Sequence, residues 1–175
     1  ALDAGPAHRD AAEAAVAAAR AHFLDAARRL STSRRDAAPR FAAAVERELA
    51  DLAMAGTRFE LRLATEDDRS RWHTGGIDHG EFFLAPNVGE APKPLARIAS
   101  GGELSRVMLA FKTLSAGDQP GRTLVFDEVD AGIGGRTATV VGEKLRRLGQ
   151  ATQVLCITHL PPIAAQAATH FAIAK

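Results

Sequence analysis

The chain has 175 residues, which is enough for one sizeable hydrophobic core, and its formal net charge is +1. A charge so close to zero does not by itself indicate a nucleic-acid or membrane surface. The single cysteine, Cys156, excludes a disulfide framework within the chain and is expected to be a plain core thiol in a reducing compartment. No apolar run approaches the roughly 18 residues of a membrane-spanning helix, and the first residues show no signal-peptide pattern.

Alanine and charged residues dominate residues 1–55, which are predicted to form a helical segment. Between residue 7 and about residue 35, small and large apolar residues recur at the spacing of a coiled-coil seam: Ala12, Val16, Ala19, Phe23, Ala26 and Leu30. Because this run is short, a bundle helix remains the alternative. Residues 36–39 predict a break or kink, since Pro39 lacks an N–H donor and clashes with the preceding turn. A second helix is expected to reach about Met54.

Residues 56–175 contain most of the glycines and predict an α/β lobe. Residues 57–63 alternate polar and apolar side chains, as an antiparallel strand with one solvated face does, and residues 81–84 are expected to return beside them. Trp72 lies in the charged loop between them, where local packing is favoured over stacking on nucleic acid. Residues 87–95 are expected to form a connecting loop.

The next segment predicts a helix whose first turn is open to an anion. Ser100 is a typical N-cap, Glu103 holds the capping-box position, and apolar residues follow at helical spacing. Gly101 and Gly102 allow a ligand to come close to the backbone. A helix N-terminus also offers unpaired N–H groups and a partial positive charge, which suit a phosphate. The same residues would cap an ordinary helix, so the motif gains weight only from the two strands that come after it in the chain.

These two strands are expected to deliver polar side chains to one edge of a sheet. A turn at residues 117–121 leads into residues 122–128, which predict a buried parallel strand ending in Asp127 and Glu128. Residues 153–159 predict a second apolar strand that ends in His159. Ligands bind at the carboxyl edge of such sheets, so these three side chains and the glycine turn are expected to converge.

The remaining elements are predicted from local signals. Residues 132–135 form a glycine-rich turn, and residues 136–148 form a helix with one apolar face. Pro161 opens another helix, because proline suits the first helical position. Residues 170–174 are expected to begin a last strand. Arg106 is expected to pair with a nearby acidic side chain.

In this order, the motifs resemble those of ABC-type ATPases. Their residue sequences are most similar to the motifs of the SMC-like repair proteins of bacteria. The signature motif of that family resembles the four residues Ser100, Gly101, Gly102 and Glu103. A glutamate at the last of these positions favours the SMC-like branch over membrane transporters. Residues 123–128 resemble the Walker B strand, Asp130 resembles the D-loop acid, and His159 resembles the switch histidine.

The resemblance implies a fold, a chemistry and cofactors. Residues 56–175 would form the α/β C-terminal lobe of an ABC/SMC-type ATPase head, and residues 1–55, with a kink near Pro39, the returning half of a coiled-coil arm. The implied cofactors are ATP and Mg²⁺, with Asp127 holding the metal through water. Glu128 would act as general base, and His159 would contact the γ-phosphate or the attacking water. The signature residues would bind ATP in trans, with Asp130 at the dimer interface.

The sequence contains no Gly-Lys pair and therefore no Walker A P-loop. In the resembling family, that loop belongs to the N-terminal lobe of the head. The implied partners are that lobe of the same protein, a second head in a homodimer, and DNA, with no membrane. The implied location is the cytoplasm, associated with the nucleoid. Alone, the chain is expected to be inactive as an ATPase.

Two other hypotheses remain open. Another SMC-like or RecF-like DNA-associated ATPase would carry the same motifs. A structural coiled-coil module would use the helical segment alone, but it gives no reason for the signature-like turn, the twin acids and His159 to occur together. Paired arginines at residues 28–29, 34–35 and 146–147 do not decide the DNA question, because solvated helix faces carry such pairs.

Overall fold

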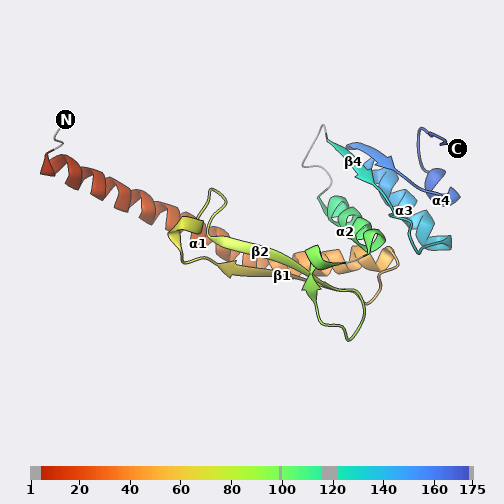
Figure 1. The fold of residues 1–175 in the computed structure, drawn as a ribbon, viewed down its shortest axis with the longest axis horizontal. Helices are drawn as coiled ribbons and strands as arrows, with labels where there is room; N and C mark the ends of the chain where they lie inside the picture. The colour runs from red at the N-terminus through yellow and green to blue at the C-terminus, as the bar shows by residue number, and fades with distance from the viewer. Residues whose placement is uncertain (1–4, 99, 116–121, 174–175) are drawn as a thin grey trace. The chain divides into compact units, whose positions relative to one another are not determined.

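The structure is a computed structural model that describes residues 5–98, 100–115 and 122–173 (Figure 1). The predicted turn at residues 117–121 and the end of the predicted last strand lie outside these residues. The elements follow one another as α1 Pro6–Asp51, β1 Arg58–Thr65, η1 Arg69–Arg71, β2 Asp78–Ala85, β3 Lys93–Pro94, η2 Leu95–Arg97, α2 Gly101–Leu114, β4 Thr123–Phe126, α3 Gly135–Leu148, β5 Gln153–Cys156 and α4 Pro161–Ala164.

The chain divides into two compact units. The first consists of Ala1–Pro39 and Arg62–Gly80, and the second of Arg40–Leu61 and Glu81–Lys175. Helix α1 and strands β1 and β2 contribute residues to both units. The functional division into a helical arm, residues 1–55, and a head lobe, residues 56–175, stays a prediction.

One continuous helix, α1, takes the place of the two predicted helices. It runs through Pro39 without interruption, so the predicted break is wrong, while a kink there stays a prediction. A proline inside a helix costs about 3 kcal/mol. The residues after it offset this cost, because Val45 and Leu49 are fully buried, and each such burial stabilises by roughly 1.5–3 kcal/mol. Lys144 of α3 also holds the end of α1 through Glu48 (2.6 Å) and Asp51 (3.1 Å).

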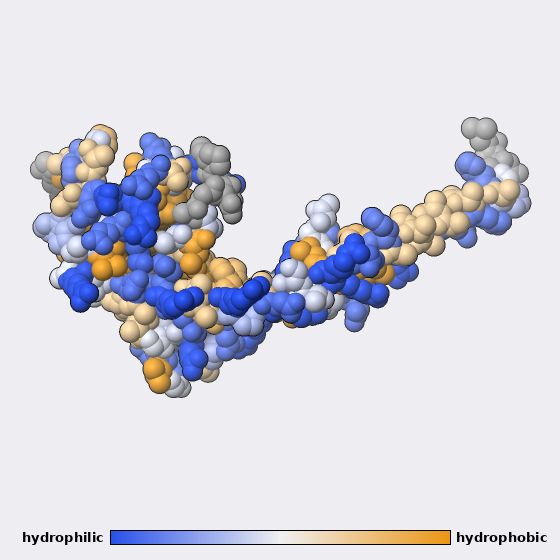
Figure 2. Space-filling model, turned by 180° about the vertical axis from the view of Figure 1, so that it is seen from behind, coloured by the Kyte–Doolittle hydropathy of each residue, from blue (hydrophilic) through white to orange (hydrophobic). Residues whose placement is uncertain are grey.

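Polar and aromatic contacts hold the first unit together. The buried carboxylate of Asp78 accepts hydrogen bonds from Ser31 Oγ (2.7 Å) and Arg34 Nη1 (3.2 Å). The Trp72 ring stacks on Phe23, with 5.5 Å between the ring centroids, so the predicted local packing of this tryptophan is confirmed. The predicted coiled-coil seam of α1 is exposed in part, since Val16 is 53% exposed. Figure 2 shows pale orange, mildly hydrophobic surface along this helix.

The second unit is built around four phenylalanines. Their ring centroids lie between 5.2 and 6.2 Å apart, and they come from α1, β1, β2 and α2: Phe41, Phe59, Phe82 and Phe111. Strands pair in the order β1-β2-β3, and β2 and β3 are antiparallel. The predicted loop at residues 87–95 thus contains a short strand, which the sequence pattern did not indicate.

Strands β4 and β5 form a separate parallel pair, with Phe126 opposite Cys156, as predicted from their apolar runs. The expectation that residues 122–128 form a buried strand is only partly right. Phe126 is buried, but Val125 is 64% and Leu155 is 47% exposed. The described elements cover only one face of this pair, which includes contacts to α3.

The predicted last strand is wrong over its described residues. Residues 170–173 adopt no regular structure, and Phe171 and Ile173 are 87% and 95% exposed. A strand needs a neighbouring strand for its backbone hydrogen bonds, and the described residues offer none there. Within the described part of the chain, no helix is both long and apolar enough to cross a membrane.

Candidate functional site

The first turn of α2 has the capped geometry that its sequence predicts. Ser100 has an extended backbone, and its Oγ accepts a hydrogen bond from the Glu103 N–H at 3.3 Å. Ser100 and Gly101 are exposed, so this end of the helix is open to solvent. The N-cap role of Ser100 is therefore confirmed, and the turn keeps the positive end of the helix dipole accessible.

Gly102 differs from this picture, because it is buried. A Cβ atom built on Gly102 would lie 2.8 Å from the Ala131 Cβ and 3.1 Å from the Glu128 carbonyl oxygen. Both distances are shorter than ordinary van der Waals contacts. Because Gly102 has no side chain, α2 can pack closely against the turn at residues 128–131. Gly101 remains the glycine that a ligand could approach.

The two predicted acids follow β4 directly, and both are exposed. Glu128 has φ +57°, in the left-handed region that residues other than glycine rarely occupy. Its carboxylate lies against Gly101, where a Cβ atom would overlap Glu128 Oε2. The structure therefore brings the glycine turn and the second acid together within this chain.

Asp130 connects the acidic turn to the predicted histidine. Its carboxylate is buried and accepts hydrogen bonds from Thr158 Oγ1 (2.5 Å) and the His159 N–H (3.1 Å), and His159 Nδ1 lies 3.1 Å from it. Burial acts to raise the pKa of Asp130, but these hydrogen bonds and the charge of His159 outweigh it and lower the pKa below its ordinary value. The His159 side chain is itself 77% exposed.

This arrangement bears on the role predicted for Asp130. Its side chain is only 6% exposed and is engaged within its own chain, whereas the backbone that follows it is exposed at Gly132 and Gly134. Any contact of this segment with a second head would therefore be made by the residues after Asp130. The interface role of the carboxylate stays a prediction.

Two residues of α2 to which the resemblance assigned no role also belong to the site. Ser105 Oγ donates to the Asp127 carbonyl oxygen (2.6 Å), and Arg106 Nη1 donates to the Ala131 carbonyl oxygen (2.8 Å). The prediction that Arg106 pairs with an acid is wrong, since the described residues give it no ion pair and it reaches a backbone carbonyl instead. Burial lowers its pKa, partly opposed by the charge of Glu103.

Asp127 is the one predicted metal-binding residue. Its carboxylate makes no hydrogen bond or ion pair within the described part of the chain, and no group of three or more His, Cys, Asp or Glu residues there is arranged to hold a metal. Mg²⁺ is commonly bound by one or two carboxylates together with phosphate oxygens and water. A single free carboxylate fits that pattern, with the other ligands coming from a nucleotide.

Cys156 lies behind the acidic turn and is free. Burial, followed by the negative charges of Asp130 and Asp127, raises its pKa to about 11. The side chain is therefore an uncharged thiol at neutral pH and a poor nucleophile, as expected for a core cysteine.

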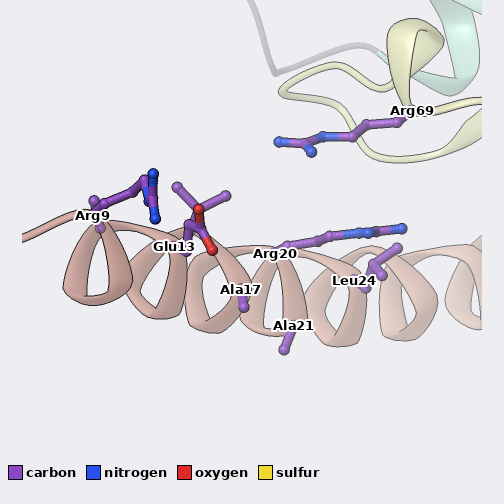
Figure 3. A pocket seen from close by; sticks show the side chains of 9 residues that line it. Arg9, Glu13, Ala17, Arg20, Ala21, Leu24 and Arg69 are labelled. Carbon is purple, nitrogen blue, oxygen red and sulfur yellow. The ribbon is translucent and has the colours of Figure 1, made fainter. Parts of the chain in front are cut away.

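A hollow in the first unit is lined by α1 residues and by Arg69, whose side chain comes from another segment and runs alongside α1 (Figure 3). Its α1 wall is mostly small and apolar, including Ala17, Ala21 and Leu24, with Arg9 and Arg20 along the same helix. None of the predicted site residues lines it.

Comparison with solved structures defines the class of this fold. The chain is similar to the Smc head domain with an extended coiled coil from Pyrococcus furiosus, bound there to the C-terminal domain of ScpA. That similarity covers 72% of this chain and 29% of that chain, with 23% identity and a TM-score of 0.51. The Smc head domain with a coiled coil and joint from Pyrococcus yayanosii matches 73% of this chain and 23% of its own, also at 23% identity and TM-score 0.51. The predicted fold class, an SMC-type ATPase head, is confirmed.

Comparison with curated sequences identifies the particular protein that the chain resembles. It is 48% identical to the DNA repair protein RecN of Treponema pallidum over 95% of this chain and 30% of the relative. It is 41% identical to RecN of Bacillus subtilis over 83% of this chain and 27% of that protein. No family model matches the chain. The chain is thus a relative of RecN, and it spans about 30% of the length of the first of these proteins.

Proposed function

We propose that the chain is the C-terminal part of an SMC-like ATPase that acts in DNA double-strand-break repair and recombination. The observation that carries the proposal is that the glycine turn, the Asp127–Glu128 pair and His159 lie close together in one chain. Glu128 lies against Gly101, and Asp130 joins the same turn to His159. Similarity to proteins named as DNA repair protein RecN supports the biological role. A protein with this role would act in the cytoplasm, at the nucleoid.

ATP hydrolysis needs a bound triphosphate, Mg²⁺, an oriented water and stabilisation of the transferred phosphoryl group. Mg²⁺ supplies charge neutralisation between the phosphates when it is bound. Asp127 would hold it through a water molecule, since its exposed carboxylate is a hard oxygen donor. Glu128 would accept the proton of the attacking water as general base. The exposed ring of His159, fixed at Nδ1 by Asp130, would present its other nitrogen to the γ-phosphate or to that water.

The first turn of α2 would serve a nucleotide that another head holds. Ser100, Gly101, Gly102 and Glu103 contribute a hydroxyl group, backbone N–H groups and a helix dipole to the γ-phosphate in trans. Two heads would then enclose two ATP molecules in a homodimer, and ATP hydrolysis would allow the two heads to separate. Residues after Asp130 would meet the second head.

Two exposed apolar surfaces suit contacts with the N-terminal lobe and with the other helix of the arm, both of which the proposal requires. Val125, Leu155 and Ile157 leave an apolar face on β4 and β5, with exposures of 64%, 47% and 60%. The N-terminal lobe of the head, with its P-loop, would cover this face. The exposed seam around Val16 suits the outgoing helix of an antiparallel arm, in which residues 1–55 form the returning half.

Two alternatives remain. A different SMC-like or RecF-like ATPase would share the site, and the similarity to RecN over 95% of the chain favours repair. A structural coiled-coil fragment without activity of its own would account for the exposed seam alone. That alternative leaves the connected site unexplained.

The chain alone is expected to show no ATP turnover and no tight ATP binding, because it lacks a P-loop. Adding the N-terminal lobe should restore both. The measurement is phosphate release by the chain, by the lobe and by their mixture. Turnover by the pure chain would contradict the proposal.

A second test concerns the general base. In the full-length protein, Glu128→Gln should keep ATP binding, lower hydrolysis by about 10²–10⁴-fold and accumulate ATP-bound dimers. Glu143→Gln, on the exposed face of α3, is the matched control and should hydrolyse normally. A Glu128→Gln protein with unchanged turnover would remove this residue from the reaction.

A further inference from the structure

The turn that presents Glu128 has a backbone conformation that must be held in place. Glu128 has φ +57°, which is unfavourable for a residue with a side chain. Such conformations persist only where surrounding contacts determine them. Within the turn, the Ala131 N–H donates to the Glu128 carbonyl oxygen at 3.0 Å. That bond closes the turn but does not attach it to the rest of the protein.

Two consecutive residues of α2 attach the turn at its two ends. Ser105 Oγ donates to the carbonyl of Asp127, immediately before Glu128, at 2.6 Å. Arg106 Nη1 donates to the carbonyl of Ala131, at the end of the turn, at 2.8 Å. Both bonds fix backbone atoms, so they restrain the path of the chain through Glu128 without touching its carboxylate.

The surroundings of Arg106 favour this role over an ordinary surface contact. Arg106 is 7% exposed, and its Nε has no hydrogen-bond partner among the residues that the structure describes. Removing a guanidinium from water is costly, and here no carboxylate compensates through an ion pair within the described residues. The side chain fits because position 102 is glycine, where a Cβ atom would lie 3.3 Å from Arg106 Nη1. Close packing therefore directs this guanidinium onto the turn.

We propose that Ser105 and Arg106 are positioning residues that hold the turn at residues 127–131 in the conformation from which Glu128 acts as general base. This inference rests on the proposed ATPase function. The two residues act on the reaction only through Glu128. Because α2 also carries the signature-like turn, they join the part of the chain that would contact one nucleotide to the part that would act on another.

The test uses the full-length protein with ATP and Mg²⁺. Ser105→Ala and Arg106→Met each remove a donor to the turn, and each should lower kcat by about tenfold or more while KM for ATP stays within about twofold. Arg106→Lys keeps a cationic donor and should retain more activity than Arg106→Met. Thr113→Ala is the matched control, since that hydroxyl donates only within α2, to the Leu109 carbonyl at 2.9 Å.

Combination with Glu128→Gln separates positioning from a general loss of structure. If Ser105 and Arg106 act through Glu128, adding either substitution to Glu128→Gln should change the residual rate by less than about twofold. A full additional tenfold loss would overturn the proposal. Equal losses of kcat in Arg106→Met and Thr113→Ala would overturn it as well.

Hydrogen exchange in the same full-length variants tests whether Ser105 and Arg106 hold the turn, without relying on an activity measurement. The Ala131 amide should exchange faster in Ser105→Ala and Arg106→Met than in Thr113→Ala. Unchanged exchange would overturn the proposal even if the ATPase function holds. A full-length wild-type protein with no ATPase activity would instead overturn the proposed function, and the positioning role with it.

Discussion

Gly102 shows how one residue can serve both a predicted motif and the packing behind it. Its neighbours Ser100 and Gly101 face solvent, where a phosphate could reach them, whereas Gly102 is buried against the turn that contains Glu128. The motif explained why glycine suits a phosphate-binding turn. It did not reveal this second reason, because the contact joins residues that are far apart in the sequence.

Gly102→Ala is expected to disturb the packing of α2 against the turn that contains Glu128. Its Cβ would lie 2.8 Å from the Ala131 Cβ and 3.1 Å from the Glu128 carbonyl oxygen, so one of the two elements must move. The expected loss is about 1–3 kcal/mol of unfolding free energy, together with a lower kcat in the full-length protein. Urea unfolding measures the first and phosphate release the second.

Gly134→Ala is the matched control for this change. Apart from its two chain neighbours, no described residue has an atom within 4 Å of a Cβ atom built there, and the backbone of Gly134 is extended. Its unfolding free energy should stay within about 0.5 kcal/mol of the wild type. Equal stability of the Gly102→Ala and Gly134→Ala proteins would show that the docking of α2 on the turn is unimportant.

Other residues of the site differ in how far the sequence could predict them. Asp127, Glu128 and His159 follow apolar runs, and a strand end is a local signal. The partners of Arg106 could not be predicted in this way, because a buried arginine commonly pairs with an acid. Here packing against Gly102 and Ala131 directs it to a backbone carbonyl. The available sequence signal was that Ser105 and Arg106 are polar residues within an otherwise apolar stretch of α2.

At the level of elements, local rules worked where a helix has its own N-cap, as α2 does, or a clear apolar stripe, as α3 does. Helix α2 begins after the predicted N-cap, and α3 begins within one residue of its predicted start at residue 136. Local rules failed for α1, since Pro39 argues for a break, and the burial of Val45 and Leu49 outweighs it. The last predicted strand failed for the opposite reason, because Phe171 and Ile173 find nothing to pack against among the described residues.

Within α1, Pro39 is expected to be a local cost that packing overcomes. Pro39→Ala should restore a backbone donor and raise the unfolding free energy by up to about 3 kcal/mol. Ala37→Gln, at an exposed position of the same helix, should change it by less than about 0.5 kcal/mol. Urea unfolding followed by circular dichroism measures both. A destabilised Pro39→Ala protein would mean that the proline is needed where it is.

For the whole molecule, the main question is whether the site works within one chain or between two. The fold is that of an SMC head, and the structure places Glu128 against its own Gly101. The proposed mechanism instead assigns the two groups of one chain to two different nucleotides. This assignment to two nucleotides was predicted from the family resemblance. It concerns contacts between two chains, so residue patterns within one chain do not predict it.

Mixing two inactive full-length proteins tests this claim most directly. Ser100→Arg should block the signature-like turn, and Glu128→Gln should remove the general base, so each protein alone should be inactive. A mixed dimer contains one intact site, made from Glu128 of the first protein and Ser100 of the second. Mixing should therefore restore about one quarter of wild-type turnover, since half of randomly formed dimers are mixed and each has one of two sites intact. Continued inactivity of the mixture, with mixed dimers shown to form, would contradict a site shared between two heads.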